Sequence, residues 1–162
     1  MQNGSDGSPD QCLYDEAMII RSHNPDLQTY DTIVVIAAPG LRQDNLRAIL
    51  STLPGFPRIL CADSVAEAES LPGLQEATLV IIDHTLQSEQ VQKAVRTIRR
   101  LHAQAWILLL AAHPRDVFSF EDCRPDTVLG DGFSHTDLIE EMQKARAFQA
   151  VHDFMNEVES HN

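Results

Sequence analysis

Five short apolar runs, separated by segments with helical periodicity, dominate the hydrophobic pattern of this 162-residue chain. The clearest run lies within Ala77–Leu86, where every residue from Thr78 to Ile82 is apolar or β-branched and Asp83 ends the run. An unbroken run of this kind is typical of a parallel strand that is buried on both faces. The five runs, each expected to form a strand, are Thr32–Ala38, Arg58–Ala62, Thr78–Ile82, Ala105–Ala111 and Asp126–Leu129.

Between the runs, apolar residues recur every three or four positions, which predicts amphipathic helices. In Leu41–Leu53 they form one stripe, and Pro54 and Gly55 follow as a turn. Ser64 and Glu67 have the spacing of a capping box, which predicts a structural role at a helix start rather than a catalytic one. The expected helices cover residues 11–21, 41–53, 64–71, 88–102 and 115–120, with a last helix, capped by Ser134 or Thr136, from residue 137 into the tail.

Strands that alternate with helices require parallel pairing through right-handed crossovers. We therefore predict an α/β fold: a flavodoxin-like, doubly wound, five-stranded parallel sheet in the order 2-1-3-4-5, with N- and C-terminal helical extensions. Residues 1–10 form a polar, Gly/Ser-rich lead-in that we expect to be disordered, and residues 11–31 form a helix and a connector. Residues 32–147 form the domain and residues 148–162 the C-terminal extension. In such sheets the chemistry occurs beyond the carboxyl ends of the strands, where Asp83 lies.

Composition narrows the possible partners. The formal charge of −12 argues against attraction to nucleic acid or to an anionic membrane, because both carry negative phosphates. Cys12, Cys61 and Cys123 form no C-x-x-C pair, and no apolar stretch approaches the roughly 18 residues that span a bilayer, so we expect a reduced, cytoplasmic protein. The histidines lack metal-ligand spacing, and the chain lacks the G-x-G-x-x-G, P-loop and G-x-S-x-G motifs. We therefore expect no structural metal, no dinucleotide cofactor and no serine-hydrolase chemistry.

Three segments together resemble the receiver domain of bacterial two-component response regulators. T-L-V-I-I-D-H-T-L (78–86) looks like the third strand of that family, which ends in the phosphoacceptor aspartate, here Asp83. W-I-L-L-L-A-A (106–112) looks like its fourth strand, and D-G-F-S-H-T-D-L (131–138) is similar to the run that follows its fifth strand. The resemblance extends from Thr32 to Arg146 and implies the fold predicted above.

The residues that support phosphorylation in that family are replaced here. Its Mg²⁺-binding acidic pair falls on Ala37 and Ala38, its switch Ser/Thr on Ala111, and its Lys after the fifth strand on Asp131. Phosphoryl transfer to a carboxylate needs Mg²⁺ and a cation to neutralise the developing charge. We therefore expect no phosphorylation of Asp83 and no Mg²⁺ cofactor, and we expect Asp131 to repel a phosphoryl group.

The resemblance and its departures together predict a receiver-like, non-enzymatic module that acts by protein–protein contact in two-component-type signal transduction. Its contact face would run from Arg115 to Arg146, and the sequence does not identify the protein partner. Two alternatives stay open. The first is an atypical phosphoacceptor that uses Asp83, in a rebuilt site where Asp83 and Asp131 share a proton or a divalent cation. The second is a small-molecule-binding flavodoxin-like domain, which an apolar crevice above Ala37 and Ala111 would favour.

An apolar stripe also continues past the end of a minimal receiver. Phe148, Val151, Met155 and Val158 follow one another at spacings of three, four and three, which is the pattern of a coiled-coil seam. Either the N-terminal helix of the same chain covers this apolar stripe, or a second copy of the chain does. We favour a homodimer in which the N-terminal helix also takes part.

Overall fold

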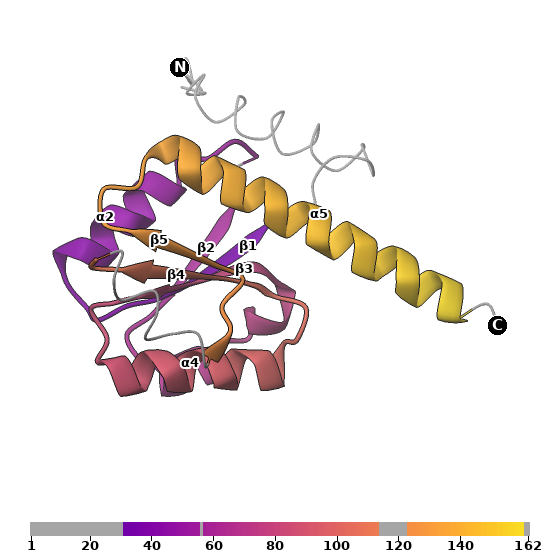
Figure 1. The fold of residues 1–162 in the computed structure, drawn as a ribbon, viewed down its shortest axis with the longest axis horizontal. Helices are drawn as coiled ribbons and strands as arrows, with labels where there is room; N and C mark the ends of the chain where they lie inside the picture. The colour runs from indigo at the N-terminus through magenta and orange to yellow at the C-terminus, as the bar shows by residue number, and fades with distance from the viewer. Residues whose placement is uncertain (1–30, 56, 114–122, 161–162) are drawn as a thin grey trace, which may run out of the picture.

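In the computed structural model, residues 31–55, 57–113 and 123–160 are described, and they form a five-stranded parallel sheet with helices on both faces (Figure 1). The sheet order is β2-β1-β3-β4-β5, which confirms the predicted doubly wound topology. The strands are β1 (Thr32–Ile36), β2 (Arg58–Ala62), β3 (Ala77–Asp83), β4 (Trp106–Ala111) and β5 (Thr127–Gly130).

The most strongly apolar of the five runs form the three inner strands, β1, β3 and β4, because these strands have a neighbouring strand on each side and helices on both faces. Every residue of β1 and β3 is buried, as is every residue of β4 after Trp106. The edge strands β2 and β5 are more exposed, as expected where only one neighbouring strand is present. Asp83 is the last residue of β3, paired in register with Leu110 of β4, so the acid ends the strand as predicted.

Two apolar layers lie on opposite faces of the sheet. Side chains of α3 (Val65–Glu69) and α4 (Ser88–Leu101) fill one layer, and those of α2 (Leu41–Leu50) and α5 (His135–Ser160) fill the other. Figure 1 shows α4 and α5 on opposite sides of the strands. A short 3-10 turn, Leu74–Glu76, precedes β3. Successive strand residues point to alternate layers, so both layers are built from the same strands.

Helix boundaries differ from the predicted ones for local reasons. Helix α2 ends at Leu50 rather than at Leu53, because the hydroxyls of Ser51 and Thr52 donate to the carbonyls of Ala48 and Ile49 at 2.7 and 2.6 Å. Such local side-chain bonds compete with continuation of a helix.

The predicted cap at the start of α3 is present. Ser64 Oγ accepts a hydrogen bond from the Glu67 amide at 3.2 Å, while the Glu67 carboxylate accepts one from the Asp63 amide at 2.6 Å. The cap therefore satisfies free backbone N–H groups at the helix start, which is the structural role predicted for it.

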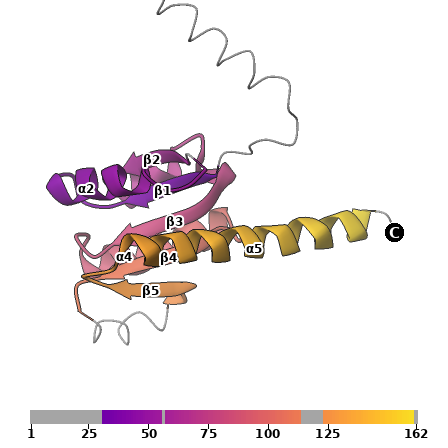
Figure 2. The same ribbon diagram turned by 90° about the horizontal axis from the view of Figure 1, so that it is seen from above.

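Helix α5 begins at His135, slightly before the predicted start. Ser134 Oγ accepts from the Asp137 amide at 3.2 Å, and the Asp137 carboxylate accepts from the Ser134 amide at 2.5 Å, so Ser134 is the cap. The helix continues to Ser160, and Figure 2 shows its last turns running well past the sheet.

Phe148, the first residue of the predicted extension, contacts the domain. Its ring packs edge-on against Trp106 with the centroids 5.5 Å apart, and His152 packs on Phe148 at 4.7 Å. Only the residues beyond this contact form an uncovered stripe.

Several predictions fall outside the described residues: the disordered lead-in at 1–10, the helices at 11–21 and 115–120, and residues 115–122 of the expected contact face. None of the helices in the described part of the chain combines the length and the apolar character needed to cross a membrane.

Candidate functional site

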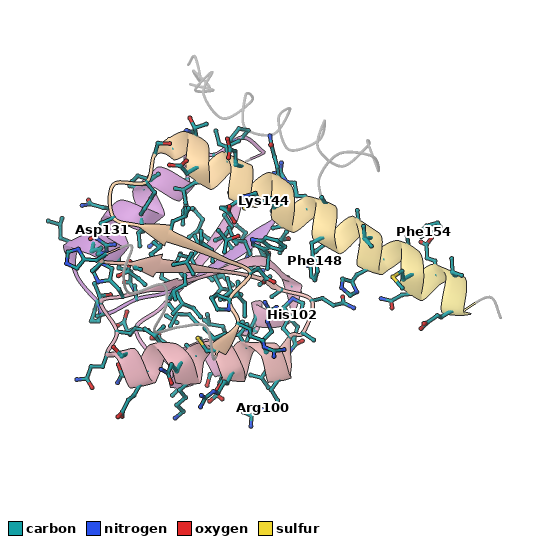
Figure 3. All side chains as sticks on the ribbon, viewed as in Figure 1. Arg100, His102, Asp131, Lys144, Phe148 and Phe154 are labelled. Carbon is teal, nitrogen blue, oxygen red and sulfur yellow. The ribbon has the colours of Figure 1, made fainter. Side chains whose placement is uncertain are left out.

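The residues singled out for chemistry lie at the edge of the sheet where the strands end. Asp83 ends β3, Asp131 directly follows β5, and Arg42 lies in the first turn of α2, which follows β1. Because parallel strands all end at the same edge, residues up to 89 positions apart in the sequence meet here. Figure 3 shows Asp131 at this edge, beside α2.

Arg42 joins the two carboxylates. Its Nε donates to both carboxylate oxygens of Asp83, at 3.0 and 2.9 Å. Its Nη2 donates to Asp131 Oδ1 at 2.6 Å. One guanidinium therefore neutralises one carboxylate and also bonds to the second. The planar fork of arginine suits this role, since it presents several donors in fixed directions.

Two turns place Arg42 and Asp83 against each other. Gly40 has φ = 138°, a conformation that other L residues rarely adopt, and it forms the turn from β1 into α2. On the other side, the Thr85 amide donates to Asp83 Oδ1 at 2.9 Å, and Thr85 Oγ1 accepts from the Ala38 amide at 3.1 Å. The loop after β3 is thereby tied both to Asp83 and to the end of β1.

The Asp83 side chain is fully buried, with 0% of its surface exposed. A buried carboxylate is costly unless it is paired and hydrogen-bonded. Asp83 meets both conditions, because Arg42 pairs with it and the Thr85 amide bonds to it. The third group of the site, Asp131, lies at the surface with 43% of its side chain exposed.

The charge balance differs from the one expected from the sequence. The sequence predicts that Asp131 repels a phosphoryl group or shares a proton or a cation with Asp83, whereas in the structure the Arg42 guanidinium lies between the two acids and compensates the charge of Asp131. The hydrogen bond from Arg42, which outweighs partial desolvation, holds the pKa of Asp131 below its usual value. Partial burial acts to lower the pKa of Arg42, yet its hydrogen bonds to Asp131 and Asp83 raise it overall.

His84 lies on the far side of Asp131. Its Nε2 is 3.4 Å from Asp131 Oδ2, too long for a well-formed hydrogen bond, so the contact is an ion pair only when the imidazole is protonated. Among the described residues His84 Nε2 is buried and has no hydrogen-bond partner, while the Asp83 oxygens accept from Arg42 and the Thr85 amide.

The residues at this edge do not fit Mg²⁺. Both Asp83 oxygens already accept hydrogen bonds from Arg42, and the carbonyl of Ala37 accepts one from Gln43 Nε2 at 3.0 Å. Mg²⁺ needs near-octahedral oxygen coordination, and a guanidinium between the two carboxylates takes the space between them. Within the described ranges, no cluster of three or more His, Cys, Asp or Glu side chains is placed to hold a metal ion.

The three alanines at the replaced family positions lie around the site without contributing side-chain chemistry. Ala37 and Ala111 are fully buried, and Ala38 is partly exposed. The backbone carbonyl of Ala111 accepts from the Asp131 amide at 3.0 Å, which fixes the start of the loop after β5. Because Ala37 and Ala111 are covered, they do not form the floor of an open crevice.

An open groove of about 400 Å³ does lie next to the site, between α2 and Phe133. Its other lining residues are Leu41, Arg42, Asn45, Leu46 and Ile49. Ligand sites usually combine apolar walls with several convergent polar groups. Here Arg42 is committed to two carboxylates and Asn45 is the other polar lining residue, so the groove gives little support to a small-molecule site.

Sequence reasoning brought attention to Asp83 and Asp131 but missed Arg42. A signal was present: an arginine in the first turn of the helix after the first strand lies at the same sheet edge as the two aspartates. From the sequence alone, Arg42 cannot be distinguished from the other polar residues of an amphipathic helix.

Solved structures similar to this chain identify the fold. A response regulator receiver domain protein from Clostridium thermocellum is 16% identical, with a TM-score of 0.64 over 75% of this chain and 98% of the other. The signal receiver domain of an HD domain-containing protein from Pseudomonas fluorescens Pf-5 is 18% identical, with a TM-score of 0.64 over 75% and 98%. A CheY-like receiver domain protein from Methanospirillum hungatei is 12% identical, with a TM-score of 0.62 over 75% and 98%. The expected receiver resemblance is confirmed at the level of the fold.

No protein-family model and no curated protein sequence matches this chain.

Proposed function

We propose that this chain is a cytoplasmic receiver-like signalling module that is not phosphorylated and that acts through constant protein–protein contact in two-component-type signal transduction. One observation carries the proposal: the Arg42 guanidinium bonds to both oxygens of the buried Asp83 and to Asp131. The receiver fold supports a signalling function. Arg42 and the two aspartates that it bonds, Asp83 and Asp131, form an arginine clamp, and this clamp supports the absence of phosphorylation.

The clamp opposes phosphorylation in two ways. Attack on a phosphorus atom needs a carboxylate oxygen that a phosphodonor can reach, whereas Asp83 has no exposed surface and both of its oxygens are bonded. The reaction also needs a divalent cation to bridge the phosphoryl and carboxylate oxygens. Arg42 supplies a positive charge, but it cannot supply open coordination positions. The site therefore favours a fixed state over one that is switched by a phosphoryl group.

Incubation with acetyl phosphate and Mg²⁺, followed by intact mass measurement, tests the proposal. We expect no adduct of about 80 Da on the native chain. Arg42→Gln opens the clamp but adds no metal ligand, so we expect it to stay unlabelled as well. An adduct on the native chain that disappears in Asp83→Asn would overturn the proposal and establish the phosphoacceptor alternative. An adduct on Arg42→Gln alone would show that the clamp, rather than the lack of metal ligands, blocks the site.

A further inference from the structure

The last turns of α5 expose apolar side chains beyond the domain. Val151, Phe154, Met155 and Val158 have 49 to 67% of their surface exposed. Among the described residues the other large apolar side chains with high exposure are Leu41 and Ile49, so most of this surface is gathered on one stretch of helix. Figure 3 shows Phe148 on the domain side of α5 and Phe154 on the part that projects past the sheet.

The exposed stripe lies on turns of α5 that extend past the end of the sheet. At 100° per residue, Val151, Met155 and Val158 lie within about 60° of one another around the helix axis. Their centre is about 140° away from that of the inward-facing Leu138, Met142 and Ala145. Phe148, which packs on Trp106, lies only about 50° from the centre of the stripe, so room for a partner helix comes from the projection of these turns past the sheet (Figure 2).

The heptad spacing, together with the lack of acids at the seam positions, favours a second copy as this partner. The spacing puts Val151 and Val158 at d positions and Met155 at an a position of a heptad. Asp153 and Glu157 then lie at the outer f and c positions, away from the seam. In a parallel pair, e and g positions of the two helices face each other, which here brings Glu159 against Phe154 of the other copy. No two acids meet across the seam.

We propose that two copies of this chain associate in parallel through Val151, Met155 and Val158, with Phe154 beside the seam. The four side chains, each about half exposed, offer about 400 Å² per copy and about 800 Å² in total. Stable interfaces begin at roughly 1,200 Å², so we expect this dimer to be weak, with a dissociation constant between about 10 and 100 µM. The proposal does not depend on the phosphorylation state of Asp83.

Sedimentation equilibrium of the full chain from about 5 to 500 µM tests the association. We expect a monomer at the low end and a dimer at the high end. Met155→Glu puts a charge into the seam and should raise the dissociation constant by at least about tenfold. Asn156→Glu adds the same charge at the outer b position and should change the constant by less than about twofold. A monomer throughout, or equal effects of the two substitutions, would overturn the proposal.

Two further measurements fix the geometry and the occupant. In a parallel pair the two copies of residue 158 face each other, so Val158→Cys should form a covalent dimer on oxidation, in excess of any formed by the native chain with its own cysteines. A dimer without this cross-link would overturn the parallel arrangement. A monomeric chain whose amides at 151–158 are protected from hydrogen exchange, and lose that protection in Leu13→Glu, would show instead that residues 1–30 of the same chain cover the stripe, and would overturn the proposal.

Discussion

At the scale of single residues, the unusual feature is a completely buried carboxylate whose charge is compensated by an arginine. Asp83 has no exposed surface, its charge is balanced by Arg42, and Oδ1 also accepts a hydrogen bond from the Thr85 amide. Removal of one partner from such a pair leaves the other charge buried and uncompensated, which costs far more than the pair itself contributes. Arg42 is therefore expected to be a structural requirement of the site as well as its defining charge.

Replacement of Arg42 should show this directly. We expect Arg42→Gln to lower the free energy of unfolding by about 2 kcal/mol, less than for a fully buried pair because Arg42 is one-third exposed. Arg42→Lys should recover part of the loss, since an ammonium carries the charge but cannot bond to Asp83 and Asp131 in the same forked geometry. Urea unfolding followed by the fluorescence of Trp106 gives the measurement. Arg47→Gln, at an exposed position of the same helix, is the control, and an equal effect of the two glutamine variants would contradict the prediction.

The Arg42–Asp131 bond also predicts a pH dependence. The pKa of Asp131 is lower in the folded state than its usual value of 3.8, so this group stabilises the fold above that value. The contribution is lost as the pH falls through the lowered pKa. We expect the native chain to be more stable than Asp131→Asn at pH 7, and we expect the gap to narrow progressively below about pH 4. A gap that widens on acidification would show that Asp131 is not held as a carboxylate by Arg42.

At the scale of elements, the sequence was sufficient for the sheet and insufficient for the clamp. The strands could be predicted because burial on both faces leaves an unbroken apolar run, as in β3, and the alternation with helices permits little but the doubly wound order. Helix ends were less predictable, since single hydroxyls such as those of Ser51 and Thr52 decide them. The Arg42 bond to Asp131 spans 89 positions and depends on side-chain direction, which periodicity does not reveal.

The same limit applies to α5, where the sequence stripe continues without a sign of where the domain ends. Phe148 packs on Trp106, whereas Phe154 is 67% exposed. We expect Phe148→Ala to lower the free energy of unfolding by about 2 kcal/mol, and Phe154→Ala by less than about 0.5 kcal/mol. Urea unfolding at about 1 µM, below the expected range of dimer formation, isolates the monomer. If both substitutions lowered the free energy of unfolding equally, the contact between Phe148 and Trp106 would not stabilise the domain, and the prediction would be wrong.

At the scale of the whole molecule, net charge and the α5 stripe act against each other. Each copy carries a formal charge of −12, so association through the stripe brings two strongly acidic bodies together. With centres about 40 Å apart, two such charges repel by roughly 4 kcal/mol at 10 mM salt, where the Debye length is about 30 Å. At 0.5 M salt the repulsion is almost entirely screened, while the apolar contacts are retained.

The dimer should therefore tighten as salt is added. We expect the dissociation constant of the full chain to fall at least about tenfold between 10 mM and 0.5 M NaCl, measured by sedimentation equilibrium. This direction is opposite to that of an interface held by ion pairs, which weakens with salt. Met155→Glu provides the control, because a chain with a disrupted seam should remain monomeric at both salt concentrations. A dimer of the native chain that dissociates at high salt would place the contact on charged surfaces and away from Val151, Met155 and Val158.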